Sequence, residues 1–65
     1  MVQLDYKRKS IEADLAGLTV AEARERYRSE LGFARKDAAV LNGIRVSAHR
    51  ESATVLRDDD QLVFR

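Results

Sequence analysis

Hydrophobic residues recur at helical spacing in one stretch of the chain, residues 18–31. Val20, Ala23, Tyr27 and Leu31 stand three or four residues apart and therefore share one face of an α-helix. Charged residues fill the opposite face. The pattern predicts an amphipathic helix whose apolar face packs on the rest of the protein.

Residues that favour helix ends flank this stretch. Thr19 is a good N-cap residue, and Glu22, three positions later, completes a capping box in which each side chain accepts a hydrogen bond from the other residue's backbone N–H. Gly32 can adopt the left-handed conformation that ends a helix. We therefore expect Thr19 to cap the helix and Gly32 to end it.

Apolar and polar residues alternate before the helix, in residues 2–15, with four polar residues, 7–10, in the middle. A period of two residues is typical of strands with one buried face, so we expect a β-hairpin with its loop at 7–10. Its buried face would carry Val2, Leu4, Tyr6, Ile11, Ala13 and Leu15.

Two short apolar runs after the helix, residues 38–41 and 44–46, are separated by Asn42-Gly43. This dipeptide is a strong hairpin signal because both residues tolerate positive φ. Phe33 is expected to pack over the end of the helix.

The remaining segments are read from their composition. Residues 34–37 and 57–60 are polar turns, and we expect one aspartate of the second turn to take positive φ. Residues 47–53 lack apolar periodicity and are expected to form a surface loop. A brief apolar segment, 54–56, precedes the second turn, and residues 61–64 form the last strand.

The predicted order is strand, strand, helix, strand, short strand, strand, which is an α+β fold with the helix across one face of a mixed sheet. We expect the last strand to lie beside the first, in parallel. The expected core residues are Leu4, Ile11, Leu15, Ala23, Tyr27, Leu31, Leu62 and Phe64.

Composition narrows the class of protein. The 65 residues suffice for one small domain, expected to span residues 1–65. The absence of cysteine excludes disulfides, thiolate metal sites and cysteine nucleophiles, and it leaves a cytoplasmic location as the default. The sequence contains neither an apolar run near the roughly 20 residues of a membrane span nor a signal peptide.

Candidate catalytic or metal-binding groups are few. His49 is the single histidine, and in the polar segment 47–53 a solvated loop residue is the simpler interpretation. Asp58, Asp59 and Asp60 carry the oxygens that divalent cations prefer, but three consecutive side chains cannot all point at one ion. We therefore expect no enzymatic activity, no metal and no cofactor.

Basic residues cluster at Lys7, Arg8 and Lys9, beside Tyr6. This cluster could hold a phosphate or an acidic partner, or it could be a solvated turn. Further basic residues on and after the helix could extend it: Arg24, Arg28, Arg35 and Lys36. Interleaved glutamates neutralise most of that surface, and the whole chain has 12 basic and 11 acidic residues, so we do not expect nucleic-acid binding.

The far face of the sheet is a candidate binding surface. If Leu62 and Phe64 face the helix, Val63 points the other way. Either Val40 or the Ala39/Leu41 pair also points outward, and Ile44 or Val46 lies near the sheet edge. The residues that we name as candidates for partner binding are Val63, Leu41, Val46, Lys7, Arg8 and Lys9.

The chain resembles the ubiquitin-like β-grasp sulfur carriers of thiamine and molybdopterin biosynthesis, the ThiS/MoaD type. The segments that carry the resemblance are LTVAEA at 18–23, AAVLNGIRV at 38–46 and TVLRDDDQLVF at 54–64. Asn42-Gly43 matches the family's turn after the helix, whereas Asp59 stands where the family usually has glycine. The resemblance covers nearly the whole chain and implies a β-grasp fold, a mixed sheet of four to five strands with one helix packed across it.

The chemistry of those carriers lies in a flexible Gly-Gly tail, whose terminal carboxylate is adenylated and converted to a thiocarboxylate. Glycine suits a tail that threads a narrow channel because it has no side chain. This chain stops at Phe64-Arg65 without Gly-Gly. We therefore expect that the chain as given cannot act as a sulfur carrier.

We consider three hypotheses for function, the third from a different class of protein than the first two. The first is a non-enzymatic ubiquitin-like module that binds a protein partner, with an adenylating or synthase-type enzyme as the implied partner. The second is a sulfur carrier cut before its Gly-Gly tail, and the third is a small RNA-associated domain of the TGS type from a larger enzyme. The sequence does not indicate the oligomeric state.

Overall fold

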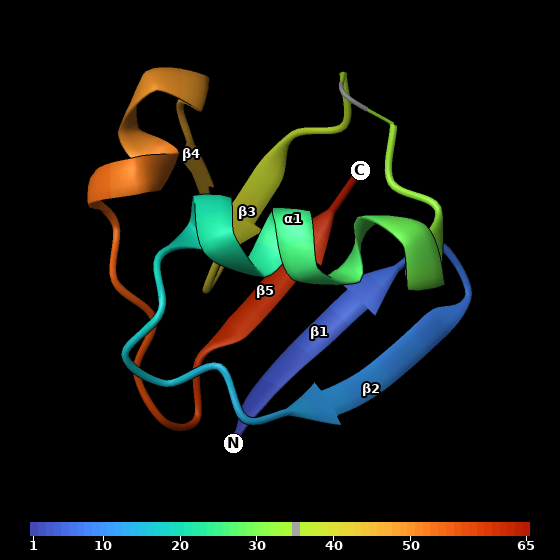
Figure 1. The fold of residues 1–65 in the computed structure, drawn as a ribbon, viewed down its shortest axis with the longest axis horizontal. Helices are drawn as coiled ribbons and strands as arrows, with labels where there is room; N and C mark the ends of the chain where they lie inside the picture. Colours follow the sequence, from blue (N-terminus) through green and yellow to red (C-terminus); the bar gives the residue numbers. More distant parts are fainter. Residues whose placement is uncertain (35) are drawn as a thin grey trace.

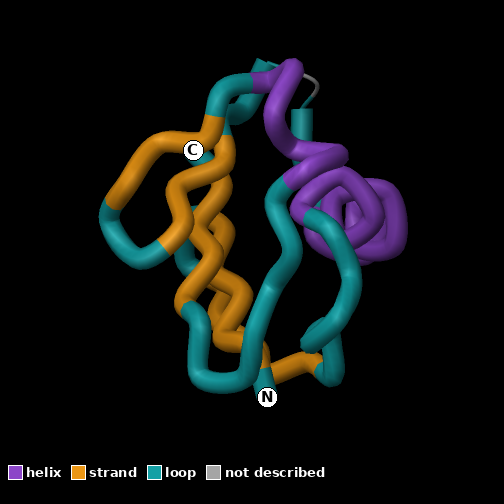
Figure 2. The backbone as a smooth tube through the Cα atoms, turned by 90° about the vertical axis from the view of Figure 1, so that its left-hand side faces the viewer, coloured by secondary structure: helices purple, strands orange, loops and turns teal. Residues whose placement is uncertain are grey.

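A computed structural model describes residues 1–34 and 36–65, in which one helix lies across one face of a five-stranded sheet (Figures 1 and 2). The α+β class predicted from the sequence is confirmed. The elements in chain order are β1 (Val2–Tyr6), β2 (Lys9–Ala13), α1 (Val20–Leu31), β3 (Ala39–Leu41), β4 (Ile44–Val46), the 3₁₀ helix η1 (Ala48–Ala53) and β5 (Gln61–Phe64).

The strands lie in the order β2-β1-β5-β3-β4, with β5 in the centre of the sheet (Figure 1). β1 and β5 are parallel, and Leu4 pairs with Leu62. The other neighbouring pairs are antiparallel. The prediction that the last strand lies beside the first, in parallel, is therefore confirmed.

The capping box forms at the start of α1 as the sequence predicts. The Thr19 hydroxyl accepts a hydrogen bond from the Glu22 N–H at 3.2 Å, and the Glu22 carboxylate accepts one from the Thr19 N–H at 2.9 Å. The Thr19 N–H also holds the pKa of Glu22 below its ordinary value. Gly32 ends the helix at φ 78°. Both helix ends are therefore set by local residues.

Replacing Thr19 with alanine should lower the free energy of unfolding by about 1 kcal/mol, because the first turn then loses its side-chain acceptor. Thr19→Ser keeps the hydroxyl and should stay within about 0.5 kcal/mol of the wild type. Urea melts of both variants measure the difference. Equal losses for serine and alanine would show that the hydroxyl does not cap the helix.

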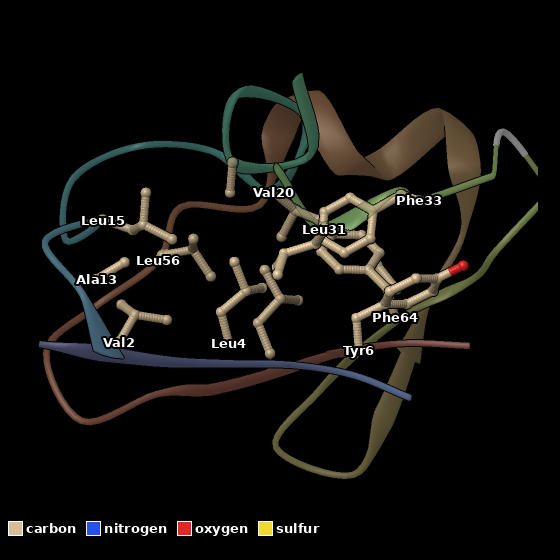
Figure 3. Packing of buried hydrophobic residues seen from close by; sticks show 13 residues of the cluster. Val2, Leu4, Tyr6, Ala13, Leu15, Val20, Leu31, Phe33, Leu56 and Phe64 are labelled. Atoms are coloured by element: carbon tan, nitrogen blue, oxygen red, sulfur yellow. The ribbon is translucent and has the colours of Figure 1, made fainter. Parts of the chain in front are cut away.

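The core lies between α1 and the sheet, and Figure 3 shows Val2, Leu4 and Tyr6 of β1 pointing into it. Ile11 and Tyr27, predicted to be core residues, are only partly buried, since Ile11 lies on the edge strand β2. Phe33 is buried as expected and contacts both Tyr6 and Phe64. The buried hydrophobic residues are Val2, Leu4, Tyr6, Ala13, Leu15, Val20, Ala23, Leu31, Phe33, Ala39, Val40, Leu56, Leu62 and Phe64.

Both predicted hairpins form, but the loop of the first is shorter than expected. Lys9 and Ser10 belong to β2, so the turn holds only Lys7 and Arg8. In the second hairpin the turn is Asn42-Gly43, with positive φ at both residues as expected.

The segment predicted to be a surface loop, residues 47–53, contains η1 instead. Glu51 of η1 is buried and forms an ion pair with Arg24 of α1, which attaches η1 to the helix. The prediction was wrong because such a polar contact leaves no apolar pattern in the sequence. Residues 54–56 then bond to the start of α1 and to the chain just before it: the Val20 N–H donates to the Thr54 carbonyl, and the Leu56 N–H donates to the Leu18 carbonyl.

Asp59 has φ 68°, which confirms that one aspartate of the second turn takes the left-handed conformation. That conformation costs an L-residue about 1–2 kcal/mol, while glycine loses about 0.5–1 kcal/mol through chain entropy. Asp59→Gly should therefore raise the free energy of unfolding by about 0.5–1 kcal/mol in a urea melt. Asp59→Ala keeps the strain and should give no gain; a gain with alanine would contradict the explanation.

Candidate protein-binding surface

The face of the sheet opposite α1, called the open face below, is the first of two candidate binding surfaces. Strand register aligns four of its residues in one row across the sheet: Asp5 of β1, Val63 of β5, Val40 of β3 and Arg45 of β4. Val40 is buried but lies outside the core cluster, and Val63 is partly exposed. The row thus has an apolar centre, with the Asp5 carboxylate on one side and the Arg45 guanidinium on the other.

A hydrogen-bonded polar cluster covers the β1–β2 side of the open face. The Gln61 amide donates to the Asp5 carboxylate at 3.0 Å, and the Gln3 amide lies 3.3 Å from both Asp5 and the Ser10 hydroxyl. The Ser10 hydroxyl and the Gln61 amide hold the pKa of Asp5 below its ordinary value. Asp5 is therefore a fixed negative charge on this surface at neutral pH.

The structure separates the apolar residues that the sequence analysis grouped as binding candidates. Val63 lies on the open face as expected. Leu41 and Val46 lie on the helix side of the sheet, partly buried against the core, and Val40 takes the outward position beside Val63. Leu41 pairs with Leu62, so their side chains share the buried face. The apolar centre of the open face is therefore Val40 and Val63.

Basic residues lie at the end of the sheet where β5 ends. Arg65 continues the pairing of β5, because its carbonyl accepts from the Ala38 N–H at 2.7 Å and its N–H donates to the Ala38 carbonyl at 3.0 Å. Arg65, Lys36 and Arg45 line one hollow on this side of the molecule, beside Val40. From the sequence, Lys36 is expected only to extend the basic cluster at residues 7–9, and neither Arg45 nor Arg65 is expected to bind a partner.

The hairpin tip formed by Lys7, Arg8 and Lys9 is the second candidate surface, and all three residues are exposed. They line a hollow with Tyr6, and the Lys7 ammonium lies 5.2 Å from the centre of the Tyr6 ring. Tyr6 pairs with Phe64, so the tip lies at the same end of the sheet as the end of β5.

Arg24 does not belong to a basic surface, contrary to one interpretation of the sequence. Its side chain is 18% exposed and is held by the Glu51 carboxylate, which accepts from both Nε and Nη2 at 2.8 Å. Arg28 is exposed but pairs with Glu25 at 3.3 Å. Arg35 lies outside the described residues.

The other candidates from the sequence have structural explanations. His49 is exposed on η1. The Asp60 carboxylate accepts from the Asn42 amide at 3.0 Å and from the Arg57 N–H at 2.8 Å, and these bonds hold its pKa below the ordinary value. Residues 1–34 and 36–65 contain no acidic or histidine cluster suited to a metal ion. In the same residues no helix has the length and hydrophobicity to cross a membrane.

Comparison with known proteins finds similarity to a solved structure. No family model matches the chain, and no curated protein matches it significantly. Among solved structures, the chain is similar to the crystal structure of a thiamine biosynthesis protein (ThiS) from Geobacter metallireducens, with a TM-score of 0.69 and 25% sequence identity over 95% of this chain and 88% of that chain. This protein therefore has a ThiS-like β-grasp fold, the α+β architecture of the sulfur-carrier-like ubiquitin folds.

Proposed function

We propose that this chain is a non-catalytic protein of the sulfur-carrier type, which docks through its open face on a partner enzyme that performs the chemistry. The likeness to ThiS over nearly the whole of both chains carries this proposal. The open face supports it, because Val40 and Val63 form an apolar centre with polar and charged residues around them. Interfaces between proteins commonly combine such a centre with a polar rim.

The end of β5 determines where a reactive tail would leave the fold. Phe64 is fully buried and Arg65 is bonded to Ala38 on both backbone groups, so the strand is held up to residue 65. A tail that can enter an adenylating site must therefore extend beyond Arg65. In such a tail the terminal carboxylate would attack ATP and release pyrophosphate, and a sulfur donor would then displace AMP to leave a thiocarboxylate.

Two forms of the protein test the carrier chemistry: the chain as given and the chain extended by Gly-Gly. Each is mixed with a thiamine-type adenylating enzyme, ATP and a sulfur donor, and the product is weighed by mass spectrometry. We expect both forms to bind the enzyme, and only the extended form to gain the mass of sulfur replacing oxygen. If the extended form binds the enzyme but its carboxylate is not converted to a thiocarboxylate, carrier chemistry is contradicted and the protein is only a binding module.

A matched pair of substitutions tests the docking face. Val63→Lys places a charge in the apolar centre of the open face and should weaken binding to the enzyme about tenfold or more. Val55→Lys makes the same change at an exposed residue outside the five-stranded sheet and should leave the affinity within about twofold of the wild type. Equal effects of the two substitutions would place the binding surface elsewhere.

A further inference from the structure

Three cationic side chains converge on one hollow of the open face, and each comes from a different part of the chain. Lys36 precedes β3, Arg45 lies on β4 and Arg65 follows β5. The residues that line the hollow are Lys36, Ala38, Val40, Gly43, Arg45 and Arg65. No acidic residue is among them.

The strand pairing accounts for this convergence. Ala38 bonds to Arg65 on one side of β3, and Val40 pairs with Arg45 on the other. The hollow is therefore built around the paired strands β3 and β4 and the end of β5. Its cations are brought together by register and not by sequence proximity.

No ion pair within 4.0 Å joins these cations to a carboxylate in residues 1–34 and 36–65, although the Ala34 N–H, helped by nearby Lys36, holds the pKa of the Asp37 carboxyl below its ordinary value. The ion pairs found there join Asp58 to the terminal amine, Arg24 to Glu51, and Arg28 to Glu25. Like charges held close together repel one another, so an external anion between them would lower the free energy. A guanidinium group can bind a carboxylate with two parallel hydrogen bonds. Arg45 and Arg65 each carry one guanidinium group, so the hollow can bind two carboxylates in this way.

The charge on the open face is divided between its two sides. Asp5 and Glu12 lie over β1 and β2, since Glu12 pairs with Gln3 and shares its face, whereas the cationic hollow lies over β3 and β4. A partner that matches this division can dock in one orientation only, because the reversed orientation places like charges opposite each other.

We propose that the hollow receives a cluster of two or more carboxylate side chains from the docking surface of the partner enzyme, and that this contact sets the orientation of the complex. The inference rests on the proposed function and specifies the partner's chemistry. The hollow itself presents mostly polar surface, but the partly exposed Val63 pairs with Val40 at its side. This neighbouring apolar residue suits a protein surface, which brings apolar groups along with its charges. Inorganic phosphate has no apolar groups to place there.

The test compares two charge reversals in the full chain. Arg45→Glu reverses a charge of the hollow, and Arg50→Glu makes the same change in net charge on η1, away from the open face. Affinity for the adenylating enzyme is measured by calorimetry at low and high salt. We expect Arg45→Glu to weaken binding about tenfold and to reduce its salt dependence, with Arg50→Glu within about twofold of the wild type.

The outcomes separate the two proposals. Wild-type binding that Arg45→Glu leaves unchanged overturns the acidic-cluster inference and keeps the proposed function. No wild-type binding overturns the proposed function and this inference with it. As a second readout, a tetraglutamate peptide should shift the amide NMR signals of Gly43 and Arg45 more than equal concentrations of inorganic phosphate or a short RNA. Equal or larger shifts with phosphate or RNA would overturn the assignment to an acidic protein segment.

Discussion

Replacing Leu62 with alanine should lower the free energy of unfolding by about 2–5 kcal/mol. Leu62 is fully buried on β5, the central strand, where it pairs with Leu4 and Leu41. The shortened side chain leaves a cavity between the sheet and α1. Because a protein of this size holds about 5 kcal/mol in total, the largest expected loss would unfold it. Urea or thermal melts followed by circular dichroism measure the change.

The neighbouring residue provides the control. Val63→Ala changes the same strand on the open face, where the side chain is partly exposed, and should cost about 1 kcal/mol. Where Leu62→Ala does not fold, Leu62→Val should still show a loss of about 0.5–1.5 kcal/mol. Similar losses for the alanine variants of Leu62 and Val63 would contradict the assignment of one buried and one open face.

Local sequence signals predicted most of the architecture because each has a local physical cause. The capping box of Thr19 and Glu22 needs only residues three positions apart, and Asn42-Gly43 forms its turn through backbone conformations that few other residues tolerate. Alternation likewise predicts that Leu62 and Phe64 share a face. The amino-acid sequence alone is therefore enough to place these elements.

The sequence predicted that the last strand lies beside the first, but it did not predict strand register or the side-chain contacts that depend on it. The choice of Val40 over Leu41 for the open face depends on the pairing of β3 with β5, which local alternation leaves undetermined. The convergence of Lys36, Arg45 and Arg65 depends on the same pairing. The sequence would have predicted these two features only if turn lengths fixed the register of β5 against β3.

The contact between η1 and α1 was also not predicted from the sequence. It is made by a buried ion pair, and residues 47–53 carry no apolar stripe that would predict packing. Arg24 and Glu51 stand 27 positions apart, and their side chains are only 18% and 9% exposed. The Arg24 guanidinium also donates to the Asp37 carbonyl at 2.8 Å and lies 4.8 Å from the centre of the Phe64 ring. Its Nη1 atom has no partner among the described residues. Arg24 thus depends on Glu51 for charge compensation.

Glu51→Ala should therefore lower the free energy of unfolding by about 3–5 kcal/mol, since it leaves the Arg24 charge buried without a carboxylate. Glu25→Ala is the matched control: it breaks the exposed pair with Arg28, whose side chains are 72% and 53% exposed, and should cost less than about 1 kcal/mol. The double variant Arg24→Met/Glu51→Leu removes both charges and should recover most of the loss, because the desolvation cost disappears along with the attraction. Urea melts of the three variants measure the free energy of unfolding. If Glu51→Ala lowers it no more than Glu25→Ala does, Arg24 is solvated and apolar contacts hold η1 against α1.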